Sequence, residues 1–287
     1  MTACDEESDT WGGGAEMRVI VTGANSGVGK ATAAALATAG HNVVIACRSI
    51  PKAEQAAADM AGAVEVAQLD LADLASVRAF ADSVESVDVL VNNAGVMGLP
   101  LTRTADGFEE HMGTNHLGHF ALTCLLGEKI KDRVISVSSA MYALSRIHLD
   151  DLNWHTRRYS KWAAYEESKL AIMLFVHELA RRGVRAYLSD PGATDTDIVR
   201  TTTGLLNWLN KRSLPRSYLH TPAQGARATV QAVTTDLPSG TYLAPRFNQW
   251  GKPKVTRPLK KARDPQMARR LWDLSAELTG CDWRGAG

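Results

Sequence analysis

A glycine-rich turn between a strand-like run and a helix-like segment constrains this chain more than any other feature. An apolar run at residues 18–21 leads into Gly23. An Ala-rich segment begins near Gly27 and Gly29 and continues to Ala39. Glycine adopts positive φ and lets a ligand approach the backbone, and the N–H groups that start a helix attract a diphosphate. The turn predicts a dinucleotide-binding site. An ordinary Gly-rich turn is the alternative, because the spacing departs from the commoner Gly-x-Gly-x-x-Gly.

Short apolar runs alternate with helical patterns along the rest of the chain. The β-branched runs lie at residues 43–46, 64–66, 87–91, 134–137, 184–188 and 241–243. The helical patterns lie at residues 51–61, 74–84, 105–126, 161–182, 222–235 and 265–279, the last with Asp264 as N-cap and Gly280 after its end. Continuous apolar runs are typical of strands buried on both faces. The alternation predicts right-handed βαβ units and an α/β, doubly wound (Rossmann) three-layer fold, with a mainly parallel sheet and helices on both faces.

Composition favours a small-molecule partner. The chain has 287 residues, 45% of them hydrophobic, and a net charge of +1, which predicts a large core and disfavours nucleic-acid or membrane partners. The cysteines lie far apart, so neither a zinc site nor a disulfide framework is expected. No apolar run of about 18 residues occurs and the N-terminus is acidic. We therefore expect a soluble, cytoplasmic protein.

The chain divides into a leader and one domain. Residues 1–16 are acidic and Gly-rich without apolar periodicity, which predicts a disordered leader before a single Rossmann-fold domain at 17–287. The rhythm breaks at about 193–220, where we expect a substrate lid, with a helix that merely packs as the alternative. The basic, Pro-containing stretch at 252–263 is interpreted as a solvated connection.

Unusual residues follow the predicted strands, where doubly wound sheets bind their ligands. They are Thr22-Gly23, Cys47-Arg48, Asp70-Leu71, Asn92 to Gly95, Ser138-Ser139 and Pro191-Gly192. An NAD site typically places a carboxylate after the second strand, and this chain has Arg48 there instead. Arg48 can pair with a 2′-phosphate in a forked geometry, and Lys30 can add charge, so NADP is expected over NAD. A solvent-facing Arg48 is the alternative.

A second signal is the pair Tyr165 and Lys169 on the helix predicted at 161–182. Residues four apart share a helix face, and a nearby cation favours the phenolate. We therefore expect a Tyr165 pKa shifted toward neutrality and a usable general acid/base, although such a pair alone is common. Ser139, after a strand, can bind a carbonyl or alcohol oxygen. Asn115 stands inside an apolar-periodic stretch, which is unusual for an amide.

Together these motifs resemble the short-chain dehydrogenase/reductase family. They are Thr22-Gly23-x3-Gly27-x-Gly29, Asn92-Asn93-Ala94-Gly95, Asn115, Ser139, Tyr165-x3-Lys169 and Pro191-Gly192-x3-Thr196, and they cover nearly all of residues 18–196. The stretches ANSGVGK, NHLGHF, DDLNW and AYEESKLA resemble more narrowly the retinol dehydrogenase and light-dependent protochlorophyllide reductase branch.

The resemblance implies a role for each motif residue. Tyr165 would donate or accept the proton, Lys169 would lower its pKa and hold the nicotinamide ribose, Ser139 would orient the substrate oxygen, and Asn115 would position a water in a proton relay. No metal is needed, because the cofactor supplies the hydride. The expected cofactor-binding set is Gly23, Asn25, Ser26, Gly27, Val28, Gly29, Arg48, Asp70, Leu71, Asn93, Ala94, Gly95, Tyr165, Lys169, Pro191, Gly192 and Thr196.

The expected function is NADP-dependent interconversion of a carbonyl and an alcohol. Four apolar residues near the strand ends favour a small apolar or aromatic substrate, with a position in the core as the alternative for each: Val96, Met97, Met141 and Tyr142. A catalytically silent NADP(H)-binding sensor or scaffold protein is the alternative, and the complete Asn, Ser, Tyr, Lys set argues against it. Ser139 and Tyr165 lie 26 positions apart, about twice the family's usual gap. The resemblance therefore does not predict the structure of the segment between them, which forms the rim of the site. Relatives include oligomers and monomers, so a homo-oligomer and a monomer are both compatible with the resemblance.

Overall fold

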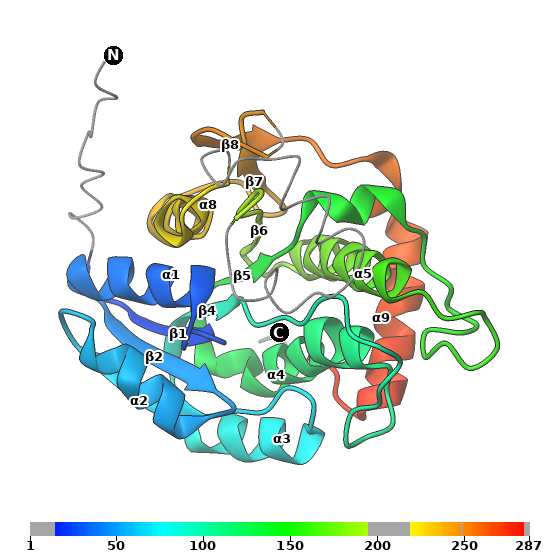
Figure 1. Ribbon diagram of the computed structural model, residues 1–287, viewed down its shortest axis with the longest axis horizontal. Helices are drawn as coiled ribbons and strands as arrows, with labels where there is room; N and C mark the ends of the chain where they lie inside the picture. The colour runs from blue at the N-terminus through cyan, green and yellow to red at the C-terminus, as the bar shows by residue number, and fades with distance from the viewer. Residues whose placement is uncertain (1–14, 195–218, 248, 284–287) are drawn as a thin grey trace.

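The computed structural model describes residues 15–194, 219–247 and 249–283. In this part of the chain one sheet runs in the order β3-β2-β1-β4-β5-β6-β7-β8 (Figure 1). Its strands are β1 (Arg18–Thr22), β2 (Asn42–Cys47), β3 (Val64–Gln68), β4 (Val87–Asn92), β5 (Ile130–Val137), β6 (Ala186–Ser189), β7 (Tyr242–Pro245) and β8 (Pro253–Thr256). Strands β1 to β7 are parallel, and β8 pairs antiparallel with β7. The predicted doubly wound, mainly parallel sheet is confirmed.

Helices cover both faces of this sheet (Figure 1). One face carries α1 (Gly27–Thr38), α2 (Ile50–Ala58) and α8 (Pro222–Thr234), and the other carries α3 (Leu74–Ser83), α4 (Gly118–Leu126), α5 (Lys161–Arg181) and α9 (Pro265–Thr279). Along β4, Val89 and Val91 pack toward the first layer and Leu90 toward the second, as expected for a strand buried on both faces. None of the helices in the described ranges has the length and hydropathy to cross a bilayer.

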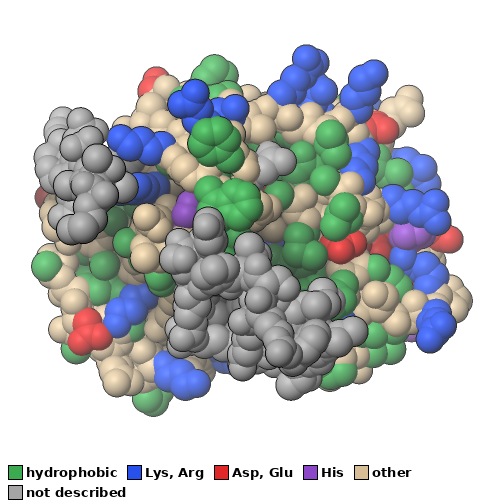
Figure 2. All heavy atoms as spheres, turned by 45° about the horizontal axis from the view of Figure 1, so that its top comes forward, with side chains coloured by type: hydrophobic (Ala, Val, Ile, Leu, Met, Phe, Trp, Pro, Cys, Tyr) green, Lys and Arg blue, Asp and Glu red, His purple; other side chains and the backbone are tan. Residues whose placement is uncertain are grey.

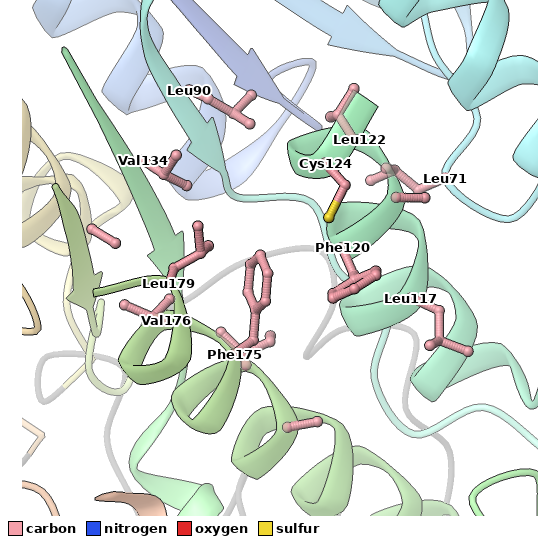
Figure 3. Close-up of a cluster of buried hydrophobic side chains, with 14 of the residues drawn as sticks. Leu71, Leu90, Leu117, Phe120, Leu122, Cys124, Val134, Phe175, Val176 and Leu179 are labelled. Carbon is pink, nitrogen blue, oxygen red and sulfur yellow. The ribbon is translucent and has the colours of Figure 1, made fainter. Parts of the chain in front are cut away.

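Aromatic packing fixes α4 and α5 against the sheet. Figure 3 shows Phe120 of α4 and Phe175 of α5 beside Leu90 and Val134 of the central strands. The two phenyl centroids lie 5.6 Å apart, and Trp272 of α9 packs on both rings. Such close-packed clusters resist displacement. Helix α5, which carries Tyr165 and Lys169, is therefore held firmly against α4 and α9.

Two predicted segments differ from the structure. The helix expected from residue 105 begins only at about residue 110, because Arg103 pairs with Glu109 in a bridge around Gly107, whose φ is +84°. The expected solvated connection at 252–263 contains the edge strand β8 and a 3-10 turn, η5 (Lys260–Arg263). Val255 and Leu259 are exposed there, whereas Ala262 is buried. Figure 2 shows hydrophobic side chains among Lys and Arg on the face that it presents. The last helix is confirmed, with Asp264 accepting from two backbone N–H groups.

Most of the expected leader and lid lies outside the described residues. Only residues 15 and 16 of the leader are described, and the lid is described at 193–194 and 219–220. Leu219 and Ala193 line the cavity discussed below. The lid and the disordered leader therefore stay predictions.

Candidate active site

One cavity of about 880 Å³ opens at the carboxyl ends of the central strands. Its volume is typical of small-molecule sites, roughly 300–1,000 Å³. Every strand end singled out in the sequence contributes to it. Its lining includes Gly23, Asn25, Ser26, Gly27, Val28, Gly29, Arg48, Asp70, Leu71, Asn93, Ala94, Gly95, Ser139, Tyr165, Lys169, Pro191 and Gly192. The structure thus brings the predicted cofactor-binding residues together; Thr196 lies outside the described residues, and Thr194 lines the cavity.

The glycine turn packs tightly against the end of β4. Gly23 and Gly27 have φ of +66° and +56°, which favour glycine. Thr22 Oγ1 accepts hydrogen bonds from the backbone N–H groups of Asn93 and Ala94, both at 2.9 Å. The N-cap Ser26 makes no side-chain hydrogen bond to the first turn of α1. The helix N–H groups therefore stay available to an anionic ligand, as a diphosphate cradle requires.

Tyr165, Lys169 and Ser139 converge in the same cavity. Ser160 caps α5, and the helix places both Tyr165 and Lys169 on its buried side, with 9% and 5% exposure. The Tyr165 phenol is hydrogen-bonded to the Ser139 side chain. Lys169 Nζ donates to the Val137 carbonyl at 3.1 Å. A hydroxyl pair with an ammonium nearby can bind a substrate oxygen and exchange a proton with it.

The predicted lowering of the Tyr165 pKa is wrong for this structure. Burial raises the pKa of Tyr165, the hydrogen bond with Ser139 opposes the rise, and the charge of Asp190 adds to it. Lys169 Nζ lies 5.7 Å from the Tyr165 ring centroid and is directed at the Val137 carbonyl, so its charge does not offset burial. Burial lowers the pKa of Lys169 itself to about 8.

Asn115 lies behind the cavity wall, in the π-helical turn η1 (Met112–Leu117). Its Oδ1 accepts from the Val96 N–H at 2.8 Å, and its Nδ2 donates to the Val96 carbonyl at 3.0 Å. A Cβ at Gly95 would lie 3.3 Å from Asn115 Oδ1 and 3.7 Å from Lys169 Nζ, so these two groups flank Gly95. π-turns are frequent at functional sites. The Asn115 amide, unusual in an apolar-periodic stretch, is thus buried close to Lys169.

The two serines after β5 have different environments. Ser138 is 2% exposed, and its Oγ donates to the Lys169 carbonyl at 3.2 Å. Ser139 caps η3 (Ala140–Leu144) and faces Tyr165. Both serines line the cavity, and Ser139 is the one whose side chain interacts with Tyr165. The substrate-orienting role of Ser139 stays a prediction.

Three further expectations have distinct outcomes. Arg48 lines the cavity. Lys30 does not, and its Nζ pairs with Asp59 at 2.7 Å. Val96, Met97 and Met141 line the cavity, whereas Tyr142 is buried and its hydroxyl accepts from the Leu259 N–H at 3.1 Å. Tyr142 is therefore a core residue, which is the alternative considered for it above.

Sequence reasoning missed Glu110 and Thr114, which also line the cavity. Burial raises the pKa of Glu110, and the nearby charge of Arg48 opposes that rise. The Glu110 carboxyl group is therefore close to the Arg48 guanidinium, which is expected to bind the 2′-phosphate of the cofactor. The available signal was the spacing, because residues 110 and 114 share one face of the helix that leads to Asn115. Trp162 and Glu166 of α5 also line the cavity, as does Gln249, whose carbonyl accepts from the Ala193 N–H.

Comparisons with known proteins agree with this geometry. Residues 17–150 match the family model described as short chain dehydrogenase. Human Retinol dehydrogenase 13 is 42% identical, over 92% of this chain and 85% of its own, and human Retinol dehydrogenase 12 is 41% identical, over 92% and 87%. A crystal structure of an uncharacterized protein from Mycobacterium paratuberculosis superposes with a TM-score of 0.82 at 45% identity, covering 94% of this chain and 96% of its own.

The relatives, the topology and the site lead to one family. Similarity extends over most of the chain and of each relative. The doubly wound sheet carries the family's glycine turn and its Tyr-x3-Lys helix at one cavity. The protein is therefore an oxidoreductase that acts on alcohol or carbonyl groups, and it belongs to the short-chain dehydrogenase/reductase family, in the retinol dehydrogenase-like branch.

Proposed function

We propose that this protein reduces a carbonyl to an alcohol, or catalyses the reverse, with NADP(H) and with Tyr165 as general acid/base. The observation that carries the proposal is the hydrogen-bonded Ser139–Tyr165 pair inside the cavity that also contains the glycine turn. The lining, which is drawn from the ends of several parallel strands and includes the glycine turn, fits a dinucleotide. When bound, the nicotinamide supplies or accepts the hydride.

The chain's own residues would hold the cofactor and move the proton. The turn at residues 23–29 would bind the diphosphate through backbone N–H groups, and Lys169 would hold a ribose. Ser139 would orient the substrate oxygen. Tyr165 would donate its proton during reduction, and its raised pKa keeps the phenol protonated at neutral pH. Asn115 would position a water that returns the proton through Lys169.

NADP is favoured by the residue after β2. Arg48 stands at the cavity where an NAD site would present a carboxylate, and its fork suits a 2′-phosphate. Substrate preference is inferred from the lining near Tyr165, where Val96, Met97, Met141 and Trp162 favour an apolar or aromatic carbonyl compound. A cytoplasmic location and a lack of nucleic-acid and membrane partners stay predictions.

A substrate screen tests the proposal. The purified protein is incubated with panels of ketones, aldehydes and alcohols, each with NADP(H) and with NAD(H), and the reduced-nicotinamide absorbance band is followed. We expect turnover of apolar carbonyl compounds that is faster with NADPH than with NADH. Turnover with NADH alone would contradict the cofactor assignment.

A further inference from the structure

Asp190 lies beneath the proposed catalytic groups, directly after β6. Asp190 is buried, with only 2% of its surface exposed. Its backbone N–H donates to the Leu243 carbonyl of β7 at 2.9 Å, so Asp190 extends the strand pairing toward the cavity. A carboxylate is seldom buried this completely without dedicated partners.

Donors from three segments converge on the Asp190 carboxylate. Tyr242 Oη of β7 donates to Oδ2 at 2.7 Å, and the Gly192 N–H donates to Oδ1 at 2.8 Å. The backbone N–H of Ala140, the residue after Ser139, is a third donor. The carboxylate therefore connects the turn that presents Ser139, the loop that presents Pro191 and Gly192, and the neighbouring strand.

Packing against Tyr142 holds Tyr242 in position for its hydrogen bond to Asp190. The residue is 3% exposed, and its ring meets the Tyr142 ring edge to face, with centroids 6.2 Å apart. The Tyr142 hydroxyl accepts from the Leu259 N–H, which fixes that ring in turn. Asp190 thus rests on packed aromatic residues, as a preorganised site requires.

We propose that Asp190 is a positioning residue of the reaction, which fastens the Ser139 turn to the Pro191–Gly192 loop and places a carboxylate beneath Tyr165 and Lys169. The inference rests on the proposed catalysis by Tyr165. None of the motifs that identify the family assigns this role to the residue, and neither the cofactor nor the substrate needs to touch it.

The carboxylate has an electrostatic effect on both catalytic groups. Its charge raises the pKa of Tyr165 and also that of Lys169, against the lowering that burial imposes on the lysine. Burial raises the pKa of Asp190 itself, and its donors and Lys169 oppose this. Other titratable groups facing this cluster are Tyr242 and Tyr142 behind it, His111 and its partner Glu109, His119 of α4, and Glu166 at the rim.

The decisive variant is Asp190→Asn, which keeps the shape and removes the charge. Alcohol oxidation needs the phenolate, so the inflection of its pH–rate profile should move to lower pH by about half a unit or more. The kcat should fall about tenfold, because the amide offers one acceptor oxygen where the carboxylate offers two and so holds the Ser139 turn less firmly. Tyr242→Phe retains the carboxylate, so it should lower kcat several-fold while leaving the inflection in place.

Tyr187→Phe is the matched control, because Tyr187 is fully buried in β6 and its hydroxyl donates to the Leu237 carbonyl instead. Its profile should equal that of the parent. The proposal would be overturned if the pH–rate profile of Asp190→Asn had its inflection at the same pH as the parent, or if Tyr242→Phe had the same kcat as the parent. If Asp190→Asn fails to fold, the kcat of Tyr242→Phe alone decides. Tyr165→Phe is assayed in parallel: parent turnover there would show that the proposed catalysis has failed, whatever Asp190→Asn does.

Discussion

The side-chain amide of Asn115 donates a hydrogen bond to Ser168 Oγ at 2.9 Å, which links the π-helical turn to α5. Ser168 in turn donates to the Tyr165 carbonyl at 2.7 Å. Asn115 is therefore tied to the helical turn between the proposed acid/base and its lysine. Its position depends on a residue that makes no contact with the cavity.

Ser168→Ala tests this link. The variant leaves an Asn115 N–H without its acceptor, so we expect a stability loss of about 1–3 kcal/mol and a several-fold fall in kcat with cofactor affinity nearly unchanged. Thr279→Ala is the control, because Thr279 is also buried and its hydroxyl donates to a carbonyl within α9. It should lose stability without losing kcat. Equal kcat in Ser168→Ala and the parent would show that the link has no catalytic role.

Gly29→Ala tests the cradle. A Cβ at Gly29 would lie 2.8 Å from the Gly23 carbonyl oxygen and 3.1 Å from Ala24 Cα, so the turn must open. We expect the NADPH dissociation constant, measured by fluorescence titration, to rise at least about tenfold. Gly40→Ala is the comparison, because Gly40 has φ +90° and open space around it. That change should cost stability only, through backbone strain.

Arg48→Ala tests the cofactor preference. Removing a forked contact to a 2′-phosphate should weaken NADP binding about tenfold or more and leave NAD binding unchanged. Lys52→Ala, at an exposed position in α2, controls for a general loss of positive charge. Binding of both cofactors is measured by calorimetry. An unchanged NADP dissociation constant in Arg48→Ala would mean that Arg48 faces solvent when the cofactor binds.

Lys169→Met tests the cost of burying the catalytic ammonium. Burial lowers the Lys169 pKa from 10.5 to about 8, so between these values the unfolded chain binds a proton that the folded chain does not. The contribution of Lys169 to the free energy of unfolding therefore becomes more favourable as the pH rises from about 8 to 10.5, and it is least favourable below about pH 8. Urea unfolding at pH 7 should show the variant more stable than the parent by up to about 3 kcal/mol, with the difference shrinking toward pH 10. A less stable variant at pH 7 would contradict this assignment.

The alternation of strands and helices and the placement of the site could be predicted because they depend on local patterns. Continuous β-branched runs such as β4 predict buried strands, and the carboxyl ends of parallel strands must meet at one edge. Asn93, Asp70 and Ser139 were therefore expected at one cavity from sequence position alone, and they line it. The caps of α9 also follow from local chemistry, since Asp264 and Gly280 act within one turn of their own position.

Contacts between distant segments could not be predicted. Arg157 lies in the insertion before Tyr165, stacks 3.9 Å from the Trp154 ring centroid and pairs with Glu167 of α5. This rim has no periodic pattern, because side-chain contacts rather than helix or strand geometry hold it. The direction of the Tyr165 pKa shift was also missed. It depends on burial and on where the Lys169 ammonium points, neither of which is set by the four-residue spacing.

The central claim, that Tyr165 is the general acid/base, is tested most directly by Tyr165→Phe. The variant keeps the ring and Lys169 and removes only the hydroxyl that bonds Ser139. Turnover of a substrate from the screen is measured together with NADPH binding, with Tyr187→Phe as the control. We predict a loss of kcat of at least about 10² to 10⁴, with the NADPH dissociation constant nearly unchanged. Parent turnover by Tyr165→Phe would contradict the account.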